Sequence, residues 1–212
     1  KSIFMATHQP HLVTVHIYVC HHTTGFMFED DVFRPIQVGR ALANTHLPIH
    51  GDDAGDNISR KNREYCELTA LYWAWKNDPD AEWIGFMHYR RFLDFACTKF
   101  QTDRFGCIVL KNMTTLTLQQ MGLNATTVHK TIEDTPNACA ILPERWSVQN
   151  VGYTSLYQHY AKADYHFSHD LDLARGVIAD LYPDDLTAFD TVMSSDEGYF
   201  TNVFVFRRDL FN

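Results

Sequence analysis

Four polar residues, His88-Tyr89-Arg90-Arg91, directly follow an apolar run, WIGFM, at 83–87. A continuously apolar run is typical of an interior strand in a parallel sheet that is covered on both faces. Ligands of open α/β sheets bind beyond the carboxyl ends of the strands, and guanidinium groups match the geometry of phosphate oxygens. The order of residues therefore predicts an anion site at a strand end. The alternative is a pair of surface arginines.

The direction of the backbone after His88 decides how many guanidinium groups can reach an anion. An extended backbone through Arg91 would send His88 and Arg90 to one side of the sheet, and Tyr89 and Arg91 to the other. We then expect one arginine to contact the ligand and the second to pair with a carboxylate such as Asp94.

More positive charge lies at the start of a predicted helix, where Ser59 is the expected N-cap and Arg60, Lys61 and Arg63 follow it. Positive side chains there are opposed by the positive end of the helix dipole. A bound anion near that end would relieve the conflict. The alternative is that these side chains extend into solvent.

Apolar side chains recur along one face of this helix, which is expected to run for about five turns, and we expect that stripe to pack on the core. Its members are Tyr65, Leu68, Tyr72 and Trp75. Glu67 lies among them, and a carboxylate in apolar surroundings needs a partner. A pair with a basic residue such as Arg91 and a direct catalytic role are the two interpretations.

The loop GDDAGDN at 51–57 precedes the helix and carries three carboxylates, Asp52, Asp53 and Asp56, with two glycines that permit tight backbone turns. In one interpretation it binds sugar hydroxyls, a ribose or a divalent cation. In the other it is an Asx-type turn that caps the following helix.

Aspartate spacing gives weak metal patterns, and we predict no metal site. Asp78 and Asp80 come before the apolar strand, at the opposite end from the arginines. Asp170 and Asp172 stand at a helix start, where capping and the helix dipole explain acidic residues. We expect the positive side chains at 88–91 to take the place of a cation.

Histidine and cysteine spacings also give no metal pattern. Neither His21 with His22 nor His166 with His169 forms a recognisable zinc motif, so packed or surface histidines are the favoured interpretation. The cysteines are odd in number and widely spaced, which argues for a reducing compartment and against structural zinc. They are Cys20, Cys66, Cys97, Cys107 and Cys139.

The composition is that of a packed globular protein, with 45% hydrophobic and 14% aromatic residues in a chain of 212. We expect a single domain over residues 1–212. Lys plus Arg number 18 against 26 Asp plus Glu, so the net charge is -8, and its field repels nucleic acid and anionic lipid surfaces. We therefore expect no nucleic-acid partner, and clustered arginines that serve one small anion.

Nothing in the chain predicts a membrane span or export. No stretch approaches the roughly 20 apolar residues that cross a bilayer, and the opening KSIFMATHQPHL lacks the apolar core of a secretory signal. We predict a cytoplasmic protein and leave open that another segment docks it on the inner face of the cytoplasmic membrane. The final RRDLFN is typical of the first turn of a helix, so we expect the natural polypeptide to continue.

Strands and helices alternate along the chain, which predicts an α/β fold. Besides the strand at 83–87, strands are expected at 12–20, 107–110, 138–142 and 202–206. Besides the helix that starts at Ser59, helices are expected at 35–43, 152–163, 169–182 and 184–193, with shorter pieces at 116–121 and 127–132.

Three longer motifs, GDDAGDNIS, KNREYCELTALYWAWKN and IGFMHYRRF, occur in this order at 51–59, 61–77 and 84–92. They resemble the DUF4422 family of bacterial capsule, exopolysaccharide and O-antigen glycosyltransferases. The similarity continues through IYVCHH, FRPIQVGRAL, AILPE, SLYQHYAKADY and NVFVFRRDLF, so it covers roughly residues 15–212.

The resemblance implies a GT-A-like, Rossmann-type three-layer sandwich with a mostly parallel central sheet. It also implies transfer of a sugar from a UDP-sugar donor to a hydroxyl of a surface glycan or lipid-linked glycan, and some members are associated with galactofuranose. Two departures concern the acceptor. Tyr199 stands where members often carry a histidine before the last strand, and residues 96–137 match only loosely. The identity of the acceptor therefore stays open.

Carried over by position, the resemblance puts these residues around the donor: Asp56, Asn57, Lys61, Asn62, Tyr65, Glu67, His88, Arg90 and Arg91. His21, at the end of the first predicted strand, is a further donor-binding candidate. We expect Arg90 to stabilise the departing diphosphate, with support from Arg91, Lys61 and His88.

A general base must take the proton of the acceptor hydroxyl. We expect it from the acidic loop, as Asp53 or Asp56, or from His159 or His169. Two other functions compete with the transferase. One is a noncatalytic nucleotide- or glycan-binding module, and the other is a metal-dependent hydrolase that uses the carboxylates at 51–56.

Overall fold

The computed structural model describes residues 13–212, which group into two compact units. The first unit holds residues 13–98, 112–142 and 202–212, and the second holds 99–111 and 143–201. A single domain over the whole chain stays a prediction, and the prediction about a secretory signal falls on residues outside the described part. No helix in the described part is long and apolar enough to cross a membrane.

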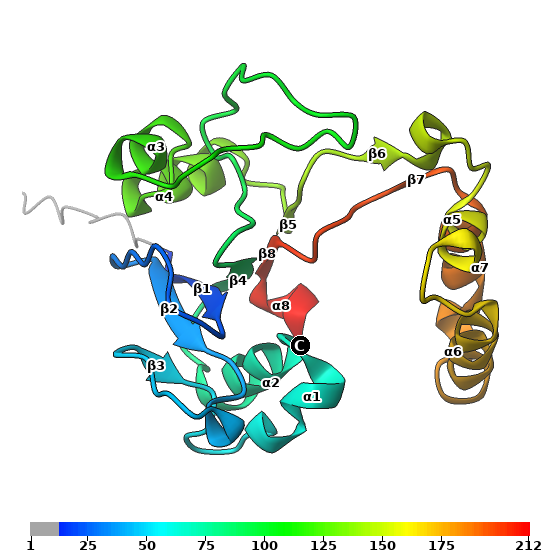
Figure 1. Ribbon diagram of the computed structural model, residues 1–212, viewed down its shortest axis with the longest axis horizontal. Helices are drawn as coiled ribbons and strands as arrows, with labels where there is room; N and C mark the ends of the chain where they lie inside the picture. Colours follow the sequence, from blue (N-terminus) through cyan, green and yellow to red (C-terminus); the bar gives the residue numbers. More distant parts are fainter. Residues whose placement is uncertain (1–12) are drawn as a thin grey trace, which may run out of the picture. The chain divides into compact units, whose positions relative to one another are not determined.

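The first unit is built on a six-stranded sheet with the strand order β3-β2-β1-β4-β8-β5 (Figure 1). Its strands are β1 Val15–His21, β2 Phe33–Gln37, β3 His50–Gly51, β4 Trp83–His88, β5 Ala140–Ile141 and β8 Phe204–Arg207. The strands β3, β2, β1 and β4 run parallel, and β8 runs antiparallel to both β4 and β5. The predicted mostly parallel central sheet is confirmed. The carboxyl ends of its parallel strands meet at one edge, which we call the carboxyl edge.

Helices cover both faces of the sheet, which confirms the predicted three-layer arrangement (Figure 1). On one face, α2 packs against Tyr18 and Ile84, residues of β1 and β4. On the other face, α4 packs against Ile17 and Met87, which alternate with those residues along the same strands. The helices of these layers are α2 Leu68–Asn77 and α8 Arg208–Phe211 on the first face, and α3 Thr115–Gln120 and α4 Ala125–Asp134 on the second.

The long helix predicted from Ser59 is interrupted. A 3-10 turn, Ser59–Lys61, leads into α1 Asn62–Tyr65, and the chain breaks at Cys66, whose backbone is left-handed with φ 50°. A non-glycine residue with positive φ ends helical hydrogen bonding, so α2 begins anew at Leu68. The single helix of about five turns is therefore wrong.

The break also explains why the predicted core stripe is wrong. Tyr65, Leu68 and Trp75 are 45%, 44% and 44% exposed, so they face solvent instead of the core. The buried residues of α2 are small ones, Thr69, Ala70 and Ala74. Small side chains let the helix axis approach the sheet closely, which a face of tyrosine and tryptophan would prevent.

The helix predicted at 35–43 is also wrong, because Pro35 lies inside β2. The amide of Ile17 donates to Val32 O and the amide of Val38 donates to His21 O, so alternate residues of β2 bond to β1. Pro35 points the other way, toward β3, which pairs with β2 only from Ile36 onward. A missing N–H at that position therefore breaks no ladder bond. After β2 the chain forms only a 3-10 turn, Arg40–Leu42.

Most other predicted elements are confirmed. The strand at 83–87 is β4, the strands at 138–142 and 202–206 contain β5 and most of β8, and the pieces at 116–121 and 127–132 fall in α3 and α4. The strand at 107–110 is wrong, since that segment makes only one isolated bridge, between Thr102 and Ile108.

The second unit is mainly helical. Its helices are α5 Leu156–Lys162, α6 Ser168–Leu181 and α7 Leu186–Ser194, with a short ladder of β6 Trp146–Ser147 and β7 Glu197–Gly198. These helices confirm the ones predicted at 152–163, 169–182 and 184–193. Aromatic rings cluster around Trp146, whose centroid lies 5.7 Å from that of Phe105 and 5.4 Å from that of Phe200.

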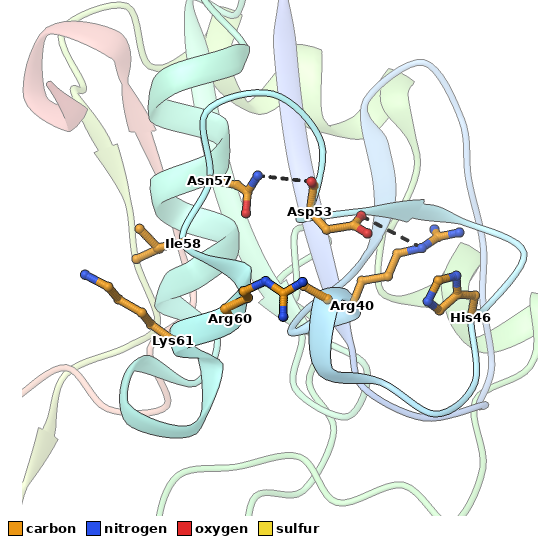
Figure 2. A pocket seen from close by; sticks show the side chains of 8 residues that line it. Arg40, His46, Asp53, Asn57, Ile58, Arg60 and Lys61 are labelled. Carbon is orange, nitrogen blue, oxygen red and sulfur yellow. Dashed lines mark hydrogen bonds and ion pairs between the residues drawn. The ribbon is translucent and has the colours of Figure 1, made fainter.

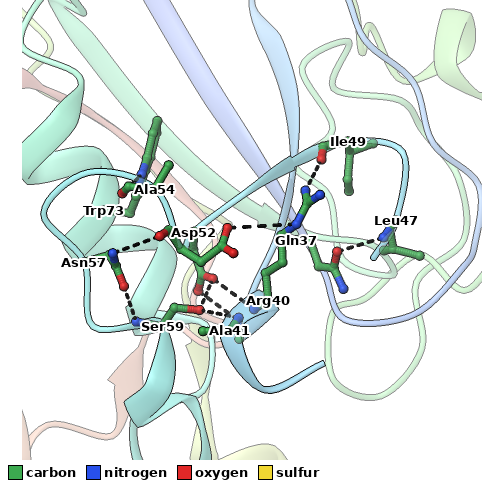
Figure 3. Close-up of polar contacts among 12 residues, drawn as sticks. Gln37, Arg40, Ala41, Leu47, Ile49, Asp52, Ala54, Asn57, Ser59 and Trp73 are labelled. Atoms are coloured by element: carbon green, nitrogen blue, oxygen red, sulfur yellow. Dashed lines mark hydrogen bonds and ion pairs between the residues drawn. The ribbon is translucent and has the colours of Figure 1, made fainter. Parts of the chain in front are cut away.

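A fully buried carboxylate, Asp52, joins the loops at the carboxyl edge (Figure 3). Its oxygens accept hydrogen bonds from the backbone amides of Gly39 at 2.8 Å and Arg40 at 3.1 Å. They also accept from the hydroxyls of Ser59 at 2.5 Å and Thr69 at 2.6 Å. Ser59 is therefore not the N-cap that the sequence predicted, because its hydroxyl serves Asp52 and its helical turn has no side-chain cap.

Replacing Asp52 by alanine should lower the free energy of unfolding by at least about 3 kcal/mol, because several buried donors lose their acceptor together. Urea denaturation followed by circular dichroism measures this change. The matched control is Asp53→Asn at the exposed neighbour, which should change stability by less than about 0.5 kcal/mol. Equal effects of the two substitutions would contradict a structural role for Asp52.

Candidate functional site

The four polar residues after β4 form a tight turn at the carboxyl edge. The amide of His88 donates to the carbonyl of Arg91 at 3.1 Å, and the amide of Arg91 donates back to the carbonyl of His88 at 3.1 Å. Tyr89 N donates to Cys20 O at 3.0 Å, which ties the turn to the end of β1. The extended backbone considered for this segment is therefore wrong. Arg90 and Arg91 are both exposed, so strand alternation does not separate them.

Glu67 lies in the break between α1 and α2 and faces the end of β4. Its Oε1 lies 3.6 Å from His88 Nε2 and accepts a hydrogen bond from Asn202 Nδ2 at 3.1 Å. The predicted ion pair between Glu67 and Arg91 is not formed. The carboxylate instead links the start of α2 to β4 and to Asn202, two residues before β8.

Glu67 and His88 influence each other's protonation. Partial burial alone would raise the pKa of Glu67, but its backbone amide, the Asn202 side chain and the charges of His88 and Arg91 hold that pKa below its usual value. Burial lowers the pKa of His88, and the positive charges of Arg91 and Arg90 add to this effect, while the Glu67 carboxylate opposes it. Near neutral pH the pair is therefore a carboxylate beside an uncharged imidazole.

His21, the last residue of β1, pairs with Gln37 of β2 on one side, and β4 runs along the other side of β1. Its side chain is 1% exposed, and neither ring nitrogen has a hydrogen-bond partner among the described residues. Burial, with the nearby His22, lowers the pKa of His21 to about 4. The centroid of the His21 ring lies 6.0 Å from that of Tyr89 in the turn after β4. A buried polar group without a hydrogen-bond partner is unfavourable, so the imidazole of His21 destabilises the structure as it stands.

A cavity of about 500 Å³ opens beside the ends of β2 and β3 (Figure 2). Its lining is mainly basic and polar, with Arg40, His46, Asp53, Asn57, Arg60 and Lys61 together with Ala41 and Ile58. The side chain of Arg40 is held in place by the carbonyl of Ile49, which accepts from its Nη1 at 2.6 Å, and by Asp53, whose Oδ1 lies 3.9 Å from its Nε. The cavity thus presents positive charge on a fixed frame.

The acidic loop is fastened to α2, which positions one wall of this cavity. Tyr72 donates its hydroxyl to Asp56 Oδ1 at 3.1 Å, and Asn77 Nδ2 donates to the carbonyl of Asp56 at 2.7 Å. Asn57 accepts from the amide of Ser59 at 3.2 Å, as in the Asx-type turn that the sequence offered as one interpretation. Asp53 and Asp56 remain exposed, so the loop is both a structural turn and a source of accessible carboxylates.

The structure brings some of the sequence-predicted site residues together. Asp53, Asn57 and Lys61 line the cavity, and Glu67 contacts His88. Asn62 has a structural contact instead, because its Nδ2 donates to the carbonyl of Cys66 at 2.6 Å.

Two of the proposed bases, His159 and His169, belong to the second unit. The His159 ring packs against Tyr153 and Phe200, with centroids 5.2 Å and 5.8 Å away, so it has a packing role there. His169 lies exposed in the first turn of α6.

Sequence reasoning missed Arg40, His46 and Asn202. Arg40 stands three residues after the end of β2, and Arg90 stands two residues after the end of β4. A strand end was therefore the available signal, but the segment 35–43 was predicted to be a helix. Asn202 precedes a strand that runs antiparallel, and the direction of that strand was not predicted.

Asp78, considered above as part of a metal motif, is engaged at the amino ends of the strands. Its Oδ2 accepts from Tyr18 at 2.7 Å and lies 2.7 Å from His16 Nδ1. Over residues 13–212, no group of three or more His, Cys, Asp or Glu side chains is arranged to hold a metal ion.

Replacing Glu67 by glutamine should lower the pKa of His88 further, because the carboxylate is the charge that favours the imidazolium form. The protonation midpoint of His88, followed by NMR of its ring nitrogens, should move to lower pH. Glu64→Gln, an exposed acid on α1, is the matched control and should leave that midpoint in place. A midpoint that stays put or rises in Glu67→Gln would show that the two groups are not coupled.

Comparisons with known proteins agree with this architecture. The family described as a domain of unknown function, DUF4422, matches residues 16–212. Among solved structures, the apo form of the WbbM bifunctional glycosyltransferase is similar, with 38% identity and a TM-score of 0.87, over 93% of this chain and 34% of that one. The chain thus spans about a third of the length of that structure. No curated protein matches it. The fold is GT-A-like, and the chain belongs to the DUF4422 family.

Proposed function

We propose that this chain is a glycosyltransferase domain that moves a sugar from a UDP-sugar donor to a hydroxyl of a bacterial surface glycan. The similarity to a bifunctional glycosyltransferase over 93% of the chain supports a transferase role. Galactofuranose is the sugar that we propose, from the family resemblance. The acceptor would be a glycan or lipid-linked glycan, met in the cytoplasm at the inner face of the membrane.

One observation carries the donor proposal: unpaired positive charge converges on the carboxyl edge of an acidic protein. Arg60, Lys61 and Arg90 are exposed and form no ion pair with any described residue, although the chain as a whole has a net charge of -8. Acidic proteins repel polyanions. Local cations left unpaired in such a chain suit one compact, strongly charged anion, and a diphosphate has that character.

The spacing of the strands fits a ligand of the length of a nucleotide diphosphate. Since β1 lies between β2 and β4, the ends of those two strands are about 10 Å apart, at about 4.8 Å for each step across the sheet. We assign the nucleoside to the Arg40 side of the cavity, and the diphosphate to the region between Lys61 of that cavity and the turn with Arg90 and Arg91. His21 ends β1, which lies between those two strands. It stays a donor-binding candidate, and its buried ring would have to become accessible before it could contact the donor.

In this proposal the side chains act mainly by electrostatic stabilisation. Arg90 and Arg91, with Lys61, neutralise the charge that develops on the departing diphosphate. His88 is held uncharged by burial, so it would contribute an N–H or a lone pair instead of a positive charge. The Glu67 carboxylate orients that ring. Together these groups would stabilise the negative charge of the diphosphate, as a bound metal cation does in other sites.

The acceptor proton requires a base within reach of the donor. Asp53 is the better candidate of the loop carboxylates, because it lines the cavity and its contact with Arg40 is long, at 3.9 Å. Asp56 does not line the cavity and accepts a hydrogen bond from Tyr72 at 3.1 Å. His159 is a poor base in its own unit because aromatic rings surround it. His169 is exposed and stays a candidate.

A noncatalytic nucleotide-binding module would use the same edge without turnover. Release of UDP from a UDP-sugar in the presence of acceptor glycan distinguishes the two functions. Binding of UDP with no release under any donor and acceptor combination would favour the module.

Arg90→Ala should weaken UDP binding by about tenfold to a hundredfold, because a charge-assisted hydrogen bond contributes roughly 1.5–3 kcal/mol. Isothermal titration calorimetry measures the affinity. The fold should be unchanged, since Arg90 is exposed at the tip of a turn. Arg63→Ala is the matched control, an exposed arginine of α1 that does not line the cavity. Unchanged affinity in Arg90→Ala would remove this arginine from the site.

Binding of UDP and turnover should both survive a chelator if arginines and lysine replace the metal. Titration calorimetry and UDP release, each with and without EDTA, make this test. Loss of activity that a divalent ion restores would instead favour a cation, and would also revive the hydrolase interpretation of the carboxylates at 51–56.

A further inference from the structure

The second unit has a cavity of its own, lined by residues of that unit alone. It is an open cavity of about 520 Å³ beside α5, α6 and α7. Ligand pockets commonly have volumes of about 300–1,000 Å³. Its lining residues are Thr154, Ser155, Tyr157, Leu171, Asp172, Arg175, Phe189, Asp190, Met193 and Ser194.

The polar groups of this cavity are already held in defined positions. Arg175 donates from Nε and Nη2 to the two carboxylate oxygens of Asp190, at 2.7 Å and 2.8 Å, so one arginine and one aspartate form a planar pair. Tyr157 donates its hydroxyl to Asp172 Oδ1 at 3.2 Å. Lone pairs on these carboxylates remain free for further donors, because a carboxylate accepts about four hydrogen bonds.

Apolar side chains supply the rest of the lining. Leu171, Phe189 and Met193 are half-buried, and each comes from a helix that also provides a polar group of the cavity. A ligand here would meet hydrogen-bond acceptors and an apolar surface at once. That combination is typical of sites that fix the orientation of a small molecule with a few polar groups.

The charge of the cavity selects among ligands. The charges of Arg175 and Asp190 cancel, so Asp172 leaves one negative charge. That charge disfavours phosphates and nucleotides. The ligand that suits this lining is a neutral molecule with several hydroxyl donors and an apolar face. A sugar ring has both features.

We propose that this cavity, formed by the second unit alone, binds one sugar unit of a saccharide chain. Hydroxyls of the sugar donate to Asp172 and Asp190, and its C–H face packs on Phe189 and Met193. The identification of that saccharide as the acceptor glycan rests on the proposed function; the binding itself does not. A site of this kind would keep a glycan attached to the domain between transfers.

The test is an NMR titration of the whole chain with the methyl glycosides of galactose, glucose and mannose, together with an Asp172→Asn variant. At least one glycoside should shift the amide signals of residues 171–175 and 189–194. Asp172→Asn removes a charged acceptor and should weaken that affinity by about tenfold or more. Asp180→Asn, an exposed acid on the same helix outside the cavity, is the matched control and should bind as the native chain does.

Each remaining outcome decides against the proposal. No shift with any of the three glycosides, equal affinity in Asp172→Asn, or tighter binding of inorganic phosphate would overturn it. Titration with UDP in the same samples keeps the two proposals apart. If glycosides bind and UDP does not, the proposed function fails while the sugar site in the second unit stands.

Discussion

The buried carboxylate of Asp52 is the interaction on which the candidate site depends. It accepts hydrogen bonds from the turn after β2, from the 3-10 turn before α1 and from α2, so separate segments of the chain converge on one side chain. A buried charge is tolerated only when its hydrogen bonds are satisfied, and here the donors include the amide of Gly39, whose backbone has φ 62°. A Cβ at that glycine would lie 2.6 Å from the Asn62 side chain, so the turn requires glycine.

This arrangement lets the edge hold positive charge that has no internal partner. Arg40 is fixed by the carbonyl of Ile49 and by its ion pair with Asp53, whereas Arg90 is carried by a hydrogen-bonded turn and has no ion pair with a described residue. The histidines nearest the centre are kept uncharged, His21 and His88 alike, because burial lowers the pKa of each. The charge offered to a ligand thus comes from guanidinium and ammonium groups, which stay protonated over the physiological range of pH. We therefore expect the carboxyl edge to bind an anion with about the same strength across that range.

Local patterns in the sequence predicted much of the fold, and contacts distant in sequence decided the rest. The apolar run before His88 and the periodic helices of the second unit were read correctly, since their signals are local. The prediction that the stripe with Trp75 faces the core was wrong because the helix breaks at Cys66. A cysteine gives no sequence signal for the left-handed backbone found there. Pro35 suggested a helix start, but only the pairing with β1 shows why a strand accepts it. Likewise, Arg40 and Asn202 join the site through strand order and direction, which single-sequence patterns do not contain.

The chain returns from the second unit to the sheet through Thr201 and Asn202, and the backbone of this connection is unfavourable. Thr201 and Asn202 both have left-handed backbones, with φ 78° and 50°, a conformation that costs non-glycine residues roughly 1–3 kcal/mol unless neighbours hold it. The hydrogen bond from Asn202 to Glu67 is one such hold. The same amide therefore fastens the crossover and helps set the charge of Glu67. By reciprocity, the ionised form of Glu67 and the ordered backbone at Asn202 stabilise each other, so a fall in pH that protonates Glu67 should also weaken the hold on this connection.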